Sequence, residues 1–262
     1  MKIKKITNYL EEFAPLVYQE NYDNCGLIVG DENAIVNSAL ISLDCTEAVI
    51  DEAIETNCNL IIAHHPIIFS ALKKLNGNNY IERTVIKAIK NNIAIYAIHT
   101  NLDNVYNGVN ASIADRLGLR NCKILAPKDK EQNLNVGSGI VGELAKSIES
   151  KVFLENLKTT METNCIRHTA LVKPTIKKIA VCGGSGSFLL SYAKDLDVDI
   201  YISADFKYHE FFDAEDKLII ADIGHYESEQ FTKGLIYDLL TKNFTKFAVR
   251  LSQVNTNPIK YL

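Results

Sequence analysis

Two parts of the chain show the same order of apolar strands and amphipathic helices, and this repetition constrains the fold most. In the first part, strands are expected at 39–44, 60–63 and 93–98, with helices at 47–56, 83–91 and 108–117. In the second part, strands are expected at 179–182, 199–202 and 218–221, with helices at 188–196, 208–214 and 231–240. Strands that alternate with helices in this way predict α/β layers whose sheets are covered on both faces.

We therefore expect an α/β protein of two similar lobes, derived from an internal duplication and packed as one unit. The first lobe is expected at residues 1–120 and the second at 176–262, with a connector of strands and a short helix at 121–175. No stretch rich in Pro, Gly and Ser separates these ranges. The chain has 262 residues, which is enough to bury a large core.

Two histidines lie side by side after the second expected strand. His64 and His65 follow the apolar run 59–63 and precede Pro66. Neighbouring side chains of an extended chain point to opposite faces, so the two imidazoles would serve two metals, or one metal and one substrate. Pro66 holds His65 in extended or turn geometry. The pair therefore predicts a metal site.

Two further motifs place a carboxylate four residues after a histidine, each beyond the last strand of its lobe. These motifs are His99 with Asp103 and His225 with Glu229. On a helical turn, residues i and i+4 share one face, so each imidazole and its carboxylate can converge. Sites in open α/β sheets form at the carboxyl ends of strands. The expected metal ligands are His64, His65, His99, Asp103, His225 and Glu229.

Six donors exceed the needs of one tetrahedral zinc but suit two ions about 3.5–4 Å apart. Mixed imidazole and carboxylate ligands favour zinc, iron or manganese without ranking them. Each motif alone also has a structural interpretation. Histidines at strand ends are commonly structural, and the Glu229 carboxylate could simply stabilise the N-terminus of a helix through the helix dipole. The occurrence of all three motifs at equivalent positions favours a dimetal site over these structural interpretations. The two lobes would then pack around that site.

The remaining motifs leave alternatives open. His168 is expected to be an exposed loop residue, and His209 to be either a surface residue or a group near the site. The glycine-rich segment 182–186 lies between a strand and a helix. Its backbone amides could cradle a phosphate, or its glycines could serve a tight turn.

Composition excludes several classes of function. The net charge of −4 gives no basic surface for nucleic acid. The amino-terminal segment lacks the apolar core of a signal peptide, and no stretch is long enough to span a bilayer, so we expect a soluble cytoplasmic protein. The six cysteines form no Cys-x-x-Cys pair, which predicts reduced thiols rather than a zinc ribbon.

Six motifs, in this order along the chain, resemble the Nif-three-like family, whose members are often named GTP cyclohydrolase 1 type 2 homologues. They lie at 23–27, 43–46, 64–66, 99–103, 182–186 and 224–229. The resemblance implies a two-lobed α/β fold, a toroidal homohexamer, and dimetal ligands at His64, His65, Asp103, His225 and Glu229, with His99 as an additional contact. Some relatives carry a ferredoxin-like domain where this chain has the short connector.

The resemblance also implies an activity on a purine nucleotide. Water activated by two metals would attack C8 of GTP, open the imidazole ring and release formate. Asp205, Glu227 and His209 are candidates for moving protons beside the ligands. The alternatives are cleavage of a nucleotide phosphoester, with phosphate held by the 182–186 segment, and a metal-binding scaffold or regulatory protein without turnover.

Overall fold

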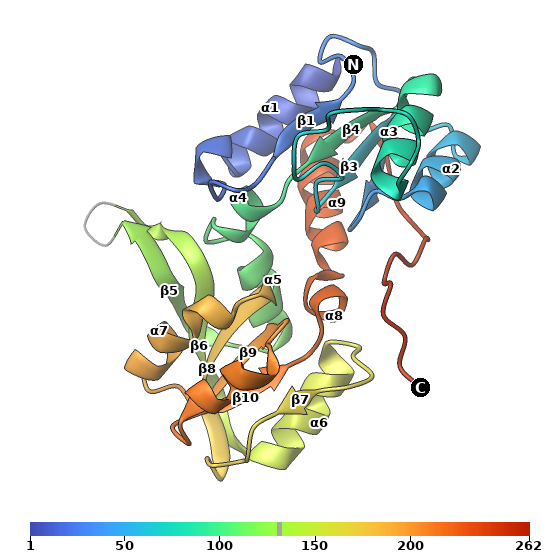
Figure 1. The fold of residues 1–262 in the computed structure, drawn as a ribbon. Helices are drawn as coiled ribbons and strands as arrows, with labels where there is room; N and C mark the ends of the chain where they lie inside the picture. The colour runs from blue at the N-terminus through green and yellow to red at the C-terminus, as the bar shows by residue number, and fades with distance from the viewer. Residues whose placement is uncertain (130–132) are drawn as a thin grey trace. The chain divides into compact units, whose positions relative to one another are not determined.

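The structure, a computed structural model, describes residues 1–129 and 133–262 (Figure 1). Its contacts divide the chain into two compact units, each with its own β-sheet. Unit 1 comprises Met1–Leu102 and Thr232–Pro258, and unit 2 comprises Asp103–Phe231 and Ile259–Leu262. The expected mixed α/β class is confirmed.

Unit 1 contains a five-stranded sheet. Its order is β1 (Gly26–Val29), β4 (Ala94–Ala97), β3 (Leu60–Ala63), β2 (Ser38–Ser42) and β11 (Ala248–Leu251). Strands β4, β3, β2 and β11 are parallel, whereas β1 is antiparallel to β4. Every residue of β2, β3 and β4 is buried, as expected for parallel strands covered on both faces.

Helices cover both faces of this sheet. On one face, α2 (Glu47–Glu55) and α3 (Tyr80–Lys90) pack on alternate strand residues such as Leu40 and Ile61. On the other face lies α1 (Ile3–Phe13), where Glu11 accepts a hydrogen bond from Tyr96 of β4. The Tyr9 hydroxyl of α1 donates to the Leu239 carbonyl of α9 (Thr232–Asn243). The short helices η1 (Leu16–Tyr18) and α4 (Thr100–Asp103) complete the amino-terminal part.

Unit 2 contains a six-stranded sheet. Its order is β5 (Arg120–Asp129), β6 (Asn133–Glu149), β8 (Thr175–Ser185), β9 (Ile200–Ala204), β10 (Ile219–Asp222) and β7 (Arg167–His168). Strands β8, β9 and β10 are parallel, and the other three run antiparallel to their neighbours. The parallel strands therefore form the centre of a sheet with antiparallel edges.

The helices of unit 2 follow the same principle. Alternate residues of the sheet, including Ala180 and Tyr201, pack with η2 (Ser187–Leu189), α7 (Leu190–Asp195) and η3 (Tyr208–Ala214). Helices α5 (Val109–Arg116) and α6 (Ser150–Thr160) contact β6 and β8, and α8 (His225–Glu229) contacts β8 and β9. The expected helix at 188–196 is thus divided into η2 and α7, and that at 208–214 is a 3-10 helix.

The two units differ from the expected ranges 1–120, 121–175 and 176–262. The segment expected as a connector supplies β5, β6, α6 and β7, so most of it is part of the unit 2 sheet or packs on it. Residues 232–258 belong to unit 1 because β11 pairs with β2 and α9 packs beside α1. Long-range strand pairing, rather than sequence order, sets these boundaries.

The two sheets share an arrangement of four strands. In unit 1, β2, β3 and β4 lie side by side in chain order, with antiparallel β1 beyond β4. In unit 2, β8, β9 and β10 lie side by side in chain order, with antiparallel β7 beyond β10. This common order is the structural counterpart of the repeated sequence pattern, while an origin by duplication stays a prediction.

Candidate metal centre

Three imidazoles gather at the carboxyl edge of the unit 1 sheet. His64 and His65 follow β3, and His99 follows the neighbouring strand β4. The centroids of the three rings are 4.9, 5.2 and 5.2 Å apart. Each ring offers a nitrogen within 4.8 Å of the nitrogens offered by the others, a spacing that can hold a metal ion. We call these residues the three-histidine cluster.

His64 and His65 do not diverge as neighbouring side chains of a strand would. Strand β3 ends at Ala63, and both histidines lie in the bend that follows. Their rings are tilted by 44° with centroids 4.9 Å apart. The expectation of opposite faces was wrong, because it assumed that extended backbone continues through the pair.

The Nδ1 atom of each ring in the cluster faces a hydrogen-bond acceptor. His64 Nδ1 lies 2.8 Å from the Ile98 carbonyl, His65 Nδ1 lies 2.8 Å from Asp44 Oδ1, and His99 Nδ1 lies 2.9 Å from Asp23 Oδ1. Carbonyl and carboxylate oxygens only accept, so each Nδ1–H must donate and each neutral ring carries its lone pair on Nε2. Metal-binding histidines commonly have this arrangement.

Asp23 is a buried carboxylate that holds His99 from behind. It also accepts hydrogen bonds from the Thr100 amide at 3.0 Å and the Thr100 hydroxyl at 2.5 Å. Burial favours the neutral acid, but the hydrogen bonds and charge of His99, together with Thr100, hold the pKa of Asp23 well below its usual range. Asp23 therefore provides a permanent negative charge behind the cluster.

The roles of Asp23 and Asp44 were missed from the sequence. Asp44 follows β2, and its position beside the end of β3 would have been a usable signal. Asp23 lies in an irregular segment before β1, where no strand or helix period marks it. Its pairing with His99 spans 76 positions, so local spacing carries no trace of it.

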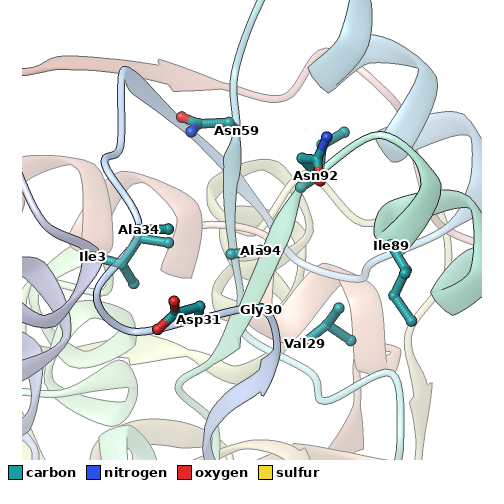
Figure 2. A pocket seen from close by; sticks show the side chains of 10 residues that line it. Ile3, Val29, Gly30, Asp31, Ala34, Asn59, Ile89, Asn92 and Ala94 are labelled. Carbon is teal, nitrogen blue, oxygen red and sulfur yellow. The ribbon is translucent and has the colours of Figure 1, made fainter.

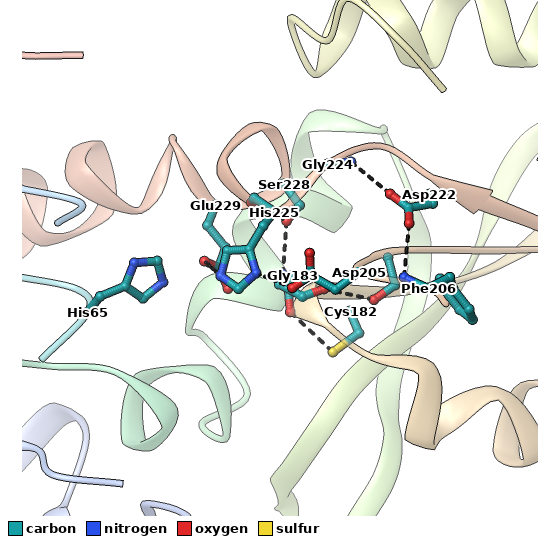
Figure 3. Close-up of polar contacts among 12 residues, drawn as sticks. His65, Cys182, Gly183, Asp205, Phe206, Asp222, Gly224, His225, Ser228 and Glu229 are labelled. Atoms are coloured by element: carbon teal, nitrogen blue, oxygen red, sulfur yellow. Dashed lines mark hydrogen bonds and ion pairs between the residues drawn. The ribbon is translucent and has the colours of Figure 1, made fainter. Parts of the chain in front are cut away.

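Unit 2 places its own donors on the short helix α8. His225 and Glu229 lie one turn apart, with 3.1 Å between Nε2 and Oε2 (Figure 3). Two ligands at about 2.0–2.1 Å from one tetrahedral ion lie about 3.3 Å apart. The observed separation is close to this value, and the predicted convergence of this motif is confirmed.

Asp205 holds the other nitrogen of the His225 ring. Its Oδ2 lies 2.6 Å from His225 Nδ1. Figure 3 includes both side chains. Burial alone would lower the pKa of His225, but hydrogen bonds and charge from Asp205 and Glu229 outweigh it and raise the pKa to about 11. These two carboxylates therefore favour a positive charge between them, whether an imidazolium or a metal cation.

The glycines of β8 let Glu229 approach the strand. Gly184 has φ +64°, and a Cβ atom there would lie 2.4 Å from Glu229 Oε1. The Gly183 amide donates to Asn110 Oδ1 and the Gly184 amide to Ser228 Oγ, both at 2.9 Å. Because these two amides already have partners, close approach explains the glycines better than a phosphate cradle does.

Asp103 belongs to unit 2, and the unit boundary separates it from His99. Its carbonyl accepts a hydrogen bond of 3.1 Å from the Asn110 side chain. Burial raises the pKa of the Cys182 thiol, and the nearby charges of Asp103 and Glu229 raise it further. The charges of Asp103 and Glu229 therefore both reach the Cys182 thiol and raise its pKa. Convergence of Asp103 with His99 stays a prediction.

The other candidate residues have different surroundings. Glu227 is buried, and its carboxylate lies where a Cβ atom on Gly224 would be. His209 is exposed, with its ring against Tyr208 and Phe212. His168 is exposed as expected. Asp205, one of the three candidates for proton movement, contacts the ring of the expected ligand His225.

A cavity of about 360 Å³ lies at the opposite end of the unit 1 strands (Figure 2). Its lining includes Asn59, which precedes β3, and Ala94, which begins β4. The Asn59 side chain bonds the Asn37 amide and the Ile35 carbonyl, so it serves the adjacent loop. The cavity is therefore separate from the three-histidine cluster, which lies at the carboxyl ends of the same strands.

The fold and these donors define an α/β protein with candidate metal-binding groups, and comparisons with known proteins agree. The family described as Duf34/NIF3 (NGG1p interacting factor 3) matches residues 1–258. The chain is 35% identical to the "GTP cyclohydrolase 1 type 2 homolog" of Clostridium acetobutylicum, over 100% of the chain and 99% of the relative. It is 32% identical to the protein of the same name from Campylobacter jejuni, over 100% of both.

Solved structures agree with the fold. Staphylococcus aureus hypothetical protein SA1388 matches with a TM-score of 0.91 at 28% identity, over 100% of this chain and 99% of that one. A Bacillus cereus protein related to NIF3 matches with a TM-score of 0.92 at 24% identity, over the same shares, and supports the fold alone. The chain belongs to the Duf34/NIF3 family, which confirms the resemblance inferred from its motifs.

The six cysteines are all free thiols. Within the described part of the chain, none of the helices has both the length and the apolar character needed to cross a membrane.

Proposed function

We propose that the protein binds two divalent metal ions and uses them to hydrolyse a purine nucleotide, by opening the imidazole ring of GTP. The proposed ligands are His64, His65, His99, Asp103, His225 and Glu229. The observation that carries the proposal is that all four imidazoles have Nδ1 beside an oxygen acceptor, which leaves Nε2 as the ligand atom. The purine substrate rests on the names of the relatives.

The residues fit zinc, iron or manganese, because imidazole and carboxylate are ligands that all three accept. Bound ions of this kind supply Lewis acidity and lower the pKa of a coordinated water toward neutrality. Asp23 and Asp44 orient His99 and His65, and Asp205 orients His225. Asp103 and Glu229 contribute the negative charge that offsets the cations.

The proposed reaction consumes water twice. One water adds at C8 and opens the five-membered ring of guanine, and a second releases C8 as formate. Asp205 is exposed and hydrogen-bonded to His225, so it can accept a proton from the attacking water and deliver it to the guanine nitrogen whose bond to C8 breaks. The phosphoesterase alternative loses support, because the Gly183 and Gly184 amides bond side chains of the protein itself.

The test begins with elemental analysis of the purified protein, before and after reconstitution with zinc, iron or manganese. The loaded protein is then incubated with GTP, and products are identified by mass spectrometry. Formate release supports the proposal, and Glu229→Gln should abolish it while His209→Gln, a change at an exposed histidine, should not. Inorganic phosphate or a nucleoside would indicate a phosphoesterase, and metal binding without turnover would indicate a scaffold. Failure to bind any transition metal would overturn every metal-dependent alternative.

We also propose that the chain self-associates as a homohexamer, because this assembly is implied by the family resemblance. Light scattering on the eluting protein should then give six times the chain mass of 29.3 kDa. A monomer or dimer at micromolar concentration would contradict this part of the proposal without affecting the metal ligands.

A further inference from the structure

The last residues of unit 1 run beside the edge of the sheet that carries the three-histidine cluster. Strand β11 is parallel to β2, with Leu251 opposite Ile41. The Ser252 amide continues this pairing and donates to the Ile41 carbonyl at 2.8 Å. Because the two chains run in one direction, the residues after Leu251 follow the path that leads from β2 to Asp44.

Residues 252–256 are fixed to this edge by several contacts. The Ser252 hydroxyl donates to Glu52 Oε2, and the backbone N–H of Gln253 donates to Glu52 Oε1 at 2.8 Å. Val254 is partly buried and packs against the core formed by α2, α3 and their strands. Chain termini are usually mobile unless they are attached in this way. The segment is therefore part of the unit 1 structure.

Thr256 ends this segment on the carboxylate that holds His65. Its hydroxyl donates to Asp44 Oδ2 at 2.5 Å, while Asp44 Oδ1 lies 2.8 Å from His65 Nδ1. The two oxygens of one carboxylate thus have different partners. With Oδ2 held by Thr256, rotation of the carboxylate would break one of the two bonds, so the hydroxyl fixes the direction from which Asp44 meets His65.

We infer that the carboxyl-terminal segment 252–256 positions the three-histidine cluster, through hydrogen bonds from Thr256 to Asp44 and from His65 to Asp44. Thr256 is a positioning residue, because its hydroxyl reaches His65 through Asp44. The inference rests on the proposed metal site and adds to it a segment remote in sequence from every ligand. A purely structural role would instead attach the terminus to the sheet with no effect on His65.

The experiment compares three variants of the full-length chain. Thr256→Val keeps the shape of the side chain and removes its hydroxyl, whereas Thr256→Ser keeps the hydroxyl. Thr241→Val is the matched control, since the Thr241 hydroxyl donates to carbonyls of its own helix α9, at Tyr237 and Asp238. Zinc affinity is measured by competition with a chromophoric chelator. In the metal-free proteins, the His65 Nδ1–H resonance and its exchange with water are followed by NMR.

Groups directly behind a ligand usually change metal affinity by about 10–100-fold, so the more remote hydroxyl should contribute roughly three- to tenfold. Thr256→Val should weaken zinc binding by that factor and speed exchange of the His65 proton, while Thr256→Ser and Thr241→Val match the wild type. Unchanged affinity and exchange in Thr256→Val would overturn the inference. If the wild type binds none of zinc, iron and manganese, the metal proposal fails, and unaltered proton exchange would then separately exclude the positioning role.

Discussion

Units 1 and 2 share a four-strand arrangement but place different chemistry at corresponding strand ends. After β3 stand His64 and His65, whereas after the corresponding β9 stands Asp205. After β4 and β10 the two units both present a histidine, His99 and His225. Unit 1 thus offers three imidazoles with carboxylates behind them, and unit 2 offers one imidazole between carboxylates.

The difference shows that one arrangement of strands can present neutral imidazole donors in one unit and an anionic carboxylate donor in the other. In unit 1, Asp44 follows β2 and supports His65. At the corresponding end of β8, unit 2 has Gly183 and Gly184, and the space beside them contains Glu229. In unit 1 the carboxylate of Asp44 therefore lies behind the candidate ligand His65. In unit 2 the carboxylate of Glu229 is itself a candidate ligand.

The largest effect is expected from changing one candidate ligand in each unit. Glu229→Gln removes a negative charge without changing shape, and His65→Gln removes an imidazole. Each should weaken metal binding by at least about a hundredfold, because ligands matter more than the groups behind them, whose loss costs about 10–100-fold. Metal content by elemental analysis and chelator competition measure the effect. Retention of both ions in His65→Gln would show that this imidazole is not a ligand and would break the comparison.

The second effect concerns the glycine that admits Glu229. Gly184→Ala places a Cβ atom 2.4 Å from Glu229 Oε1 at a residue with φ +64°. Gly118→Ala is the matched control, since its φ is +69° and nothing lies within 4 Å of the added atom. The control should lose about 1 kcal/mol of unfolding free energy from backbone strain, and Gly184→Ala about 3 kcal/mol. Equal losses in denaturant titrations would show that Glu229 moves away freely.

Much of this framework was predictable because its signals are local. The apolar run 60–63 was expected as a strand and is β3. The spacing of His225 and Glu229 predicted a shared helix face, and α8 brings their donor atoms to 3.1 Å. Both predictions depend only on the period of the strand or helix.

The remaining features depend on pairing between remote segments. Strand β11 is short and mostly exposed, so its pattern gives no sign that it pairs with β2 and returns residues 232–258 to unit 1. Thr256 reaches Asp44 across 212 positions. The convergence of the rings of His64 and His65 depends on where β3 ends, which hydrophobicity locates only to within a residue or two.

The smallest effect is expected from changing the carboxylate behind one histidine in each unit, which is Asp23 in unit 1 and Asp205 in unit 2. Asp205→Asn and Asp23→Asn both replace an acceptor behind an imidazole, and each should weaken metal binding about tenfold. Their effects on stability should differ. Asp205 is exposed, whereas Asp23 is buried and accepts from His99, Thr100 and Cys25. An amide cannot accept at both positions, so Asp23→Asn should also lose about 2 kcal/mol of unfolding free energy.

Urea titration of the metal-free variants measures this difference without any contribution from bound ions. Asp205→Asn should lose no more than about 1 kcal/mol of unfolding free energy, as is usual for an ion pair whose two side chains are partly exposed. If Asp205→Asn proved as destabilising as Asp23→Asn, the support of His225 would be as important to the fold as that of His99. The contrast between a buried support in unit 1 and an exposed one in unit 2 would then be lost.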